Sequence, residues 1–247
     1  KAAIRPTNQP PNWVLDTNPA PAPSTATTTP RLTNGKPDMT GVWNAAPLPI
    51  PGSGTRRCGP TQVKGGGVNP DVGCKIGQDN FWVDYEWISP SRFGPSHPIY
   101  KPEFWDKVQE LDQWTNKEDP IMTCQPMGLP RSGTPRRIFQ TANDITMLYT
   151  TGDYGGGNRE FRVIPTDGRK HDAQKSIEAT FYGYSVGHWE GDTLVIDSIS
   201  FVDSTWLGRG GLFHSANMHI VEKFTRKGDE IVYEITVDDP DVFAEPW

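Results

Sequence analysis

The chain of 247 residues lacks any apolar run as long as a membrane-spanning helix, which takes about 20 residues, and no signal-type apolar segment stands at its start. It also lacks a basic excess, because 24 Lys and Arg stand against 30 Asp and Glu and give a net charge of −6. A chain without a positive field is poorly suited to hold a phosphate backbone or an anionic bilayer. We therefore expect no nucleic-acid partner and no membrane insertion.

Cysteine is scarce, with only three residues. Cys58 and Cys74 flank a Gly-rich loop and lie 16 positions apart, and a disulfide across such a loop would contribute about 3 kcal/mol. Cys124 would then be an odd thiol, and three free thiols are the alternative. The Pro-, Thr- and Ala-rich opening has no start Met, which favours a mature form without its leader. We expect an exported protein, periplasmic or extracellular.

Apolar residues are few as well, at 34% of the chain, whereas Gly (25) and Pro (24) are abundant. This composition is typical of a mainly β protein with many turns and argues against a helix-rich architecture. One helix is expected in "KPEFWDKVQELDQW", residues 101–114, where a Pro stands in the first turn and apolar residues recur at helical spacing.

Two parts of the chain are distinguished by their composition. Residues 1–37 are expected to form an extended N-terminal arm, since Pro and Thr at this density bury little apolar area. Residues 38–247 are expected to form a single β-barrel domain, interrupted at about 45–100 by a long irregular insertion rich in Gly, Pro and Trp.

Alternating apolar and polar residues predict about eight antiparallel strands, enough to close a small lipocalin-like barrel. The candidate segments are 39–43, 137–140, 145–150, 159–164, 180–189, 193–198, 218–225 and 230–237. In "SVGHWEGDTLVID" a two-residue turn within "EGD" would put Gly187 and Trp189 on one face with Leu194, and Tyr184 and His188 on the other. Glu190 and Asp192 are then turn residues, although a three-residue loop would exchange the pairings.

One carboxylate on the last hairpin breaks this pattern. Glu222 shares a face with the apolar residues Met218, Ile220 and Phe224 and so points inward. An inward Glu either pairs with a cation such as Arg162 or has its pKa raised by burial, which would suit a general acid or base. Both interpretations stay open.

Four of the five His lie in the last third of the chain: His171, His188, His214 and His219. Three His, or two His with Glu222, would suit Zn or another divalent ion, but their spacing matches no standard metal signature. We therefore expect no cofactor and leave the metal ligands unknown. Arg131 and Arg169 stand in loops where they would bind an anionic or hydroxylated ligand.

Six blocks resemble, in order, a large family of exported bacterial proteins with no assigned activity: "KPDMTGVW", "CQPMGLPR", "FRVIPTDGRKH", "SVGHWEGDTLVIDS", "HSANMHIVEKFTR" and "DDPDVFAEPW". The resemblance covers roughly residues 30–44 and 100–247, with Phe213 where the family has Pro before His214. The "TGVW" of the first strand is also similar to the opening of lipocalin-like barrels.

These observations lead to a first hypothesis, an exported enzyme that acts on a small or carbohydrate-like molecule by proton transfer in a barrel cavity, as a lyase, isomerase or hydrolase. Its expected catalytic residues are Glu222, His171, His214 and Tyr184. Its expected ligand-binding residues are Arg169, Arg162, Arg131, His188 and His219. A lipocalin-type binding protein and a cell-surface scaffold with a filled barrel are the alternatives, and the oligomeric state is left open.

Overall fold

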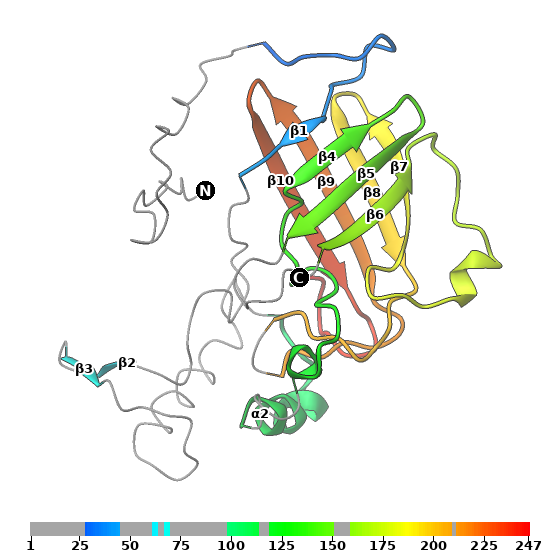
Figure 1. Ribbon diagram of the computed structural model, residues 1–247. Coiled ribbons are helices and arrows are strands. Elements are labelled where there is room, and N and C mark those ends of the chain that lie inside the picture. The colour runs from blue at the N-terminus through cyan, green and yellow to red at the C-terminus, as the bar shows by residue number, and fades with distance from the viewer. Residues whose placement is uncertain are drawn as a thin grey trace.

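A computed structural model of the protein describes residues 28–44, 61–63, 67–69, 98–113, 119–150, 159–208 and 211–247. Two four-stranded antiparallel sheets make up most of it (Figure 1). The first has the order β1-β4-β5-β6, with β1 at Gly41–Val42, β4 at Arg137–Gln140, β5 at Asp144–Thr150 and β6 at Arg159–Pro165. The second has the order β10-β9-β8-β7, with β7 at Tyr184–Glu190, β8 at Thr193–Ile199, β9 at His219–Lys227 and β10 at Glu230–Asp238. The mainly β class is confirmed, but the described strands form no closed barrel.

Few other elements accompany the sheets. The expected helix is present as the 3-10 turn η1, Pro102–Phe104, followed by α2, Trp105–Gln113. The short elements are the hairpin of β2, Thr61–Val63, with β3, Gly67–Asn69, and the 3-10 turns η2, Pro120–Thr123, and η4, Lys175–Ile177. Among the described residues, no helix has the length and apolar character needed to cross a bilayer. Cys58 and Cys74, most of the N-terminal arm and most of the insertion lie outside the described residues.

The β7–β8 hairpin has the pairing that the two-residue turn predicts. Glu190 pairs with Thr193, so that the turn residues are Gly191 and Asp192, and Trp189 lies opposite Leu194. The predicted strand 180–189 was too long, because the structure begins it at Tyr184. Gly183 ends the preceding turn with a φ of +69°, a left-handed conformation that interrupts an extended strand.

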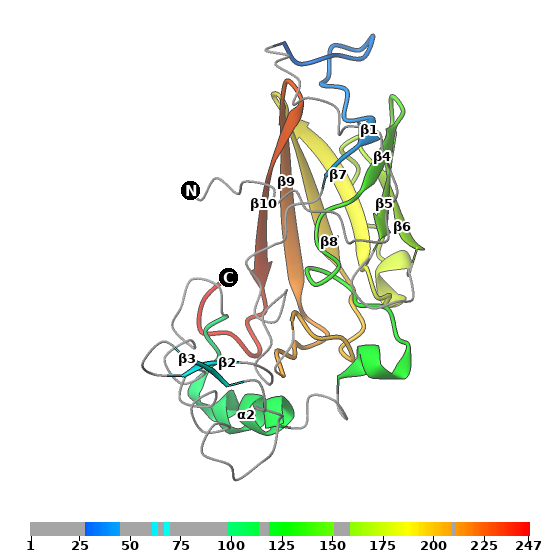
Figure 2. The ribbon, with the colours of Figure 1, turned by 60° about the vertical axis from the view of Figure 1, so that its left-hand side comes forward.

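The core lies between the inner faces of the two sheets, which pack face to face (Figure 2). The first sheet contributes Ile138, Ile145, Met147 and Ile164, and the second contributes Leu194, Ile196, Ile220 and Phe224; all are buried. Burial of one such side chain stabilises the fold by about 1.5–3 kcal/mol. The inner faces are thus apolar almost throughout, and a charged residue among them needs a partner.

Strands β6 and β7 are the facing edges of the two sheets, and they meet at one point. The amide of Gly168 donates to the carbonyl oxygen of Gly187 at 3.1 Å. A side chain at Gly187 would lie 3.3 Å from the carbonyl oxygen of Pro165, so glycine permits this close approach. Beyond this contact a groove of about 640 Å³ runs along residues 160–163 of β6 and residues 180–185.

Candidate functional site

Glu222 lies in the core and is held there by an ion pair. An oxygen of its carboxylate accepts a hydrogen bond from the Arg162 guanidinium at 2.6 Å, and the hydroxyl of Tyr233 donates to the other oxygen at 3.0 Å. The side chains of Glu222 and Arg162 are 1% and 4% exposed, so this ion pair is buried in the core. The cationic-partner interpretation of Glu222 is therefore the one that the structure shows, and its use as a general base is corrected.

Arg162 makes the other hydrogen bonds of this buried network. Its guanidinium donates to the hydroxyl oxygens of Tyr149, Ser185 and Ser198 at 2.9 to 3.0 Å. Burial is the largest single influence on the pKa of Arg162 and lowers it, but the Glu222 carboxylate and Tyr149 together outweigh burial and hold this pKa above its usual value. Arg162 therefore joins the two sheets, and through Ser185 it also reaches the floor of the groove.

His214 is buried at a different place from the other His residues. Its Nε2 lies 2.7 Å from the Thr205 hydroxyl and its Nδ1 lies 2.8 Å from the Ser215 carbonyl oxygen. Burial lowers the pKa of His214, which favours the neutral ring. Both ring nitrogens are satisfied within the fold, so His214 is corrected from a catalytic residue to a structural one.

Three side chains that are distant in sequence meet on the outer face of the second sheet. Nε2 of His171 and Nε2 of His219 lie 2.8 Å and 3.1 Å from the same Asp197 oxygen, Oδ1. Asp197 pairs with Val221 across β8 and β9, and His219 stands two residues before Val221, so these side chains share one face. His171 reaches this face from the segment that follows β6.

The hydrogen bonds to Asp197 define the proton positions on His171. An ionised carboxylate only accepts hydrogen bonds, so a neutral His171 ring in this contact has its proton on Nε2 and its lone pair on Nδ1. Nδ1 is buried and has no hydrogen-bond partner among the described residues. An unpaired buried acceptor costs about 1–3 kcal/mol, and such groups in native proteins often have a catalytic role or a role in binding.

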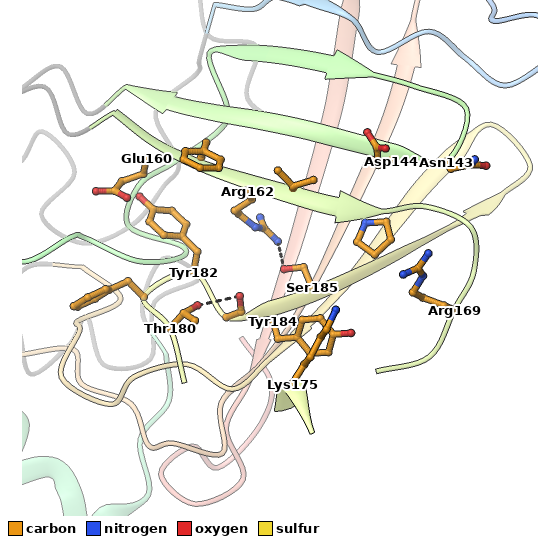
Figure 3. A pocket seen from close by; sticks show the side chains of 15 residues that line it. Asn143, Asp144, Glu160, Arg162, Arg169, Lys175, Thr180, Tyr182, Tyr184 and Ser185 are labelled. Carbon is orange, nitrogen blue, oxygen red and sulfur yellow. Dashed lines mark hydrogen bonds between the residues drawn. The ribbon is translucent and has the colours of Figure 1, made fainter. Parts of the chain in front are cut away.

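Tyr184 connects this cluster with the groove. Its ring packs edge-on against the His171 ring, with 5.1 Å between centroids, and its side chain also lines the groove. Figure 3 shows Arg162 and Ser185 in the middle of the groove, with Glu160 and Tyr182 toward one end and Arg169 toward the other. Tyr182 donates or accepts a hydrogen bond with Ser132 at 2.7 Å, and burial raises the pKa of Tyr182 to about 12.

The remaining predicted ligand-binding residues are divided between the groove and other sites. Arg169 lines the groove, and its hydrogen bonds to Asp167 lower the pKa of that carboxyl to about 2.

Arg131 donates two hydrogen bonds, of 2.8 and 2.7 Å, to the carboxylate of buried Asp119, away from the groove. His188 is exposed and lies 3.1 Å from Glu190. Arg131 and His188 therefore lie beside carboxylates and outside this groove, and their role in ligand binding stays a prediction.

Asp197 is the functional candidate that sequence reasoning missed. It stands within the alternating strand "TLVIDS", where a single outward Asp is ordinary. The available signal was its position on the same face as Tyr184, which follows from the hairpin register. In the described part of the chain, no group of three or more His, Cys, Asp or Glu is arranged to hold a metal ion.

The geometry places this chain in a class, a two-sheet β protein with a polar groove between two strand edges. No protein-family model, no curated protein and no solved structure matches it.

Proposed function

We propose that the protein is an exported enzyme that transfers protons to and from a small or carbohydrate-like molecule in the β6–β7 groove, without an organic cofactor. The observation that carries this proposal is His171, whose Nε2 is held by Asp197 while its Nδ1 is buried and unpaired. His171 does not line the groove itself but lies behind Tyr184, whose ring it contacts. A carboxylate that holds one imidazole nitrogen and leaves the other as a base is the arrangement by which many enzymes activate a proton acceptor.

In this proposal His171 is the general base, and Asp197 keeps its tautomer and stabilises the imidazolium that forms. His219 is a positioning residue, because its Nε2 donates to the same Asp197 oxygen. Tyr184 is the acid, since its side chain lines the groove and its ring contacts His171. Lyase, isomerase and hydrolase reactions all use such an acid and base pair.

Turnover of a panel of small saccharides, sugar acids and their esters tests the proposal, with products detected by mass spectrometry. His171→Gln is expected to lower kcat/KM by at least about 100-fold, the usual contribution of a general base. His188→Gln is the matched control, because this exposed His lies on the same sheet face but bonds to Glu190 and contacts neither Asp197 nor Tyr184. Full activity of His171→Gln would refute the proposed role.

The second candidate is a lipocalin-type binding protein, favoured by the four aromatic side chains that line the groove: Phe161, Phe181, Tyr182 and Tyr184. Under this candidate the two sheets are the halves of a lipocalin-like barrel that is open along the β6–β7 seam. Ligand binding without turnover, at equal affinity in the wild type and in His171→Gln, would support binding alone.

A further inference from the structure

The two walls of the groove carry opposite charges. The wall made by β6 and the start of β5 presents the carboxylates of Asp144 and Glu160. The opposite wall, from residues 166–185, presents the cations Arg169 and Lys175 (Figure 3). A ligand that spans the groove therefore meets hydrogen-bond acceptors on one side and positive charge on the other.

Three of these four charges make no close ion pair in the described part of the chain, although the Asp172 carboxylate attracts Lys175 over a longer distance. Arg169 is paired with Asp167, two residues before it, through hydrogen bonds of 2.9 and 3.0 Å from Nε. Neither the carboxylates of Asp144 and Glu160 nor the ammonium of Lys175 takes part in an ion pair with another described residue. Lys175 is thus the groove cation that no close ion pair neutralises among the described residues.

Aromatic side chains lie between the charged walls. Tyr182 and Tyr184 line the groove beside Phe161 and Phe181, and Tyr184 is the residue that contacts His171. Sugar rings present apolar C–H faces that pack on aromatic rings, and sugar hydroxyls donate hydrogen bonds to carboxylates. A neutral sugar would satisfy the carboxylate wall and the aromatic rings but would leave Lys175 without a close ion pair.

We infer that the groove binds an acidic saccharide, a uronate whose carboxylate pairs with Lys175 and whose hydroxyls donate to Asp144 and Glu160. This inference rests on the proposed function, because it names the class of substrate that the same groove would present to Tyr184 and, behind it, to His171. It predicts that affinity depends on the ligand's carboxylate and on the charge of residue 175.

Isothermal titration calorimetry at low salt tests the inference. The probes are galacturonate and mannuronate trisaccharides, each compared with the same trisaccharide after reduction of its carboxylates to alcohols. We expect at least one uronate to bind about two- to fivefold more tightly than its reduced form, as an added ion pair to an exposed Lys would give. Lys175→Gln should abolish this preference, and Lys170→Gln, an exposed charge of the same segment that does not line the groove, should preserve it.

Three results would overturn the inference: equal affinity for the uronates and their reduced forms, an unchanged preference in Lys175→Gln, or tighter binding of a short acidic peptide than of either uronate. The outcome is distinguishable from that of the proposed function. Uronate binding that depends on Lys175 without His171-dependent turnover supports the ligand class and contradicts the catalysis. His171-dependent turnover of a neutral sugar, without uronate binding, supports the catalysis and contradicts the ligand class.

Discussion

At the scale of single residues, the buried pair of Arg162 and Glu222 is expected to contribute more to folding than to chemistry. Removal of one partner leaves an uncompensated charge in the core, which typically costs about 3–5 kcal/mol. Glu222→Gln should therefore lower the free energy of unfolding by about 3 kcal/mol in urea denaturation at pH 7, since Arg162 stays buried and charged.

The double variant Arg162→Met with Glu222→Leu is the control for this prediction. It removes both charges, so its loss of unfolding free energy should be smaller than the sum of the losses in Arg162→Met alone and in Glu222→Leu alone. Additive losses would show that the two side chains do not stabilise each other and would contradict the network described for Tyr149, Ser185 and Tyr233.

The lowered pKa of His214 predicts how the stability of the protein depends on pH. Because burial lowers the pKa of His214 below the ordinary value of 6.5, the unfolded chain binds a proton at this residue more readily than the folded protein. The contribution of His214 to the free energy of unfolding is complete above pH 6.5. It declines as the pH falls toward the pKa that His214 has in the folded protein. The loss of unfolding free energy between pH 7 and pH 5 should be larger for the wild type than for His214→Asn. An equal loss in both proteins would contradict this prediction.

At the scale of elements, Gly183 determines where β7 begins. A β-carbon at this position would lie 2.7 Å from the Phe201 ring and 2.8 Å from the Ile199 carbonyl oxygen, and its φ is +69°. Gly183→Ala should therefore destabilise the protein by more than about 2 kcal/mol, from steric overlap in addition to backbone strain. Guanidinium denaturation measures this difference.

The matched control is Gly191→Ala in the β7–β8 turn. Gly191 also has a positive φ, +60°, but no atom lies within 4 Å of its would-be β-carbon. Gly191→Ala should lower the free energy of unfolding by only about 1 kcal/mol, the cost of the left-handed conformation for alanine. Equal losses for the two variants would show that the contact with Phe201 is unimportant.

Most strands could be predicted from the sequence, because their pairing depends on local patterns. In the hairpin of β7 and β8, the "EGD" turn and the alternation of Trp189 and Leu194 with polar residues are enough to define the register. The inward position of Glu222 followed from the same alternation. The start of β7 was missed, since Gly183 is required by contact with Phe201, which lies far along the chain.

At the scale of the whole molecule, the site depends on topology that local patterns do not contain. His214 and His219 are close in sequence, but His214 bonds to Thr205 in a buried loop, whereas His219 faces outward from β9. His171 joins His219 only because β6, β7, β8 and β9 bring their segments together around Asp197. The sequence therefore indicated two of the three members of this cluster and could not indicate which carboxylate they share.

The central claim is that Asp197 holds His171 with its Nδ1 unprotonated, ready to accept a proton. Long-range nitrogen–proton NMR of the histidine rings at pH 8, where an ordinary imidazole is neutral, tests it most directly. We predict that His171 is in the tautomer with the proton on Nε2 and that Asp197→Asn weakens this preference. A His171 ring with its proton on Nδ1 in the wild-type protein would contradict the account.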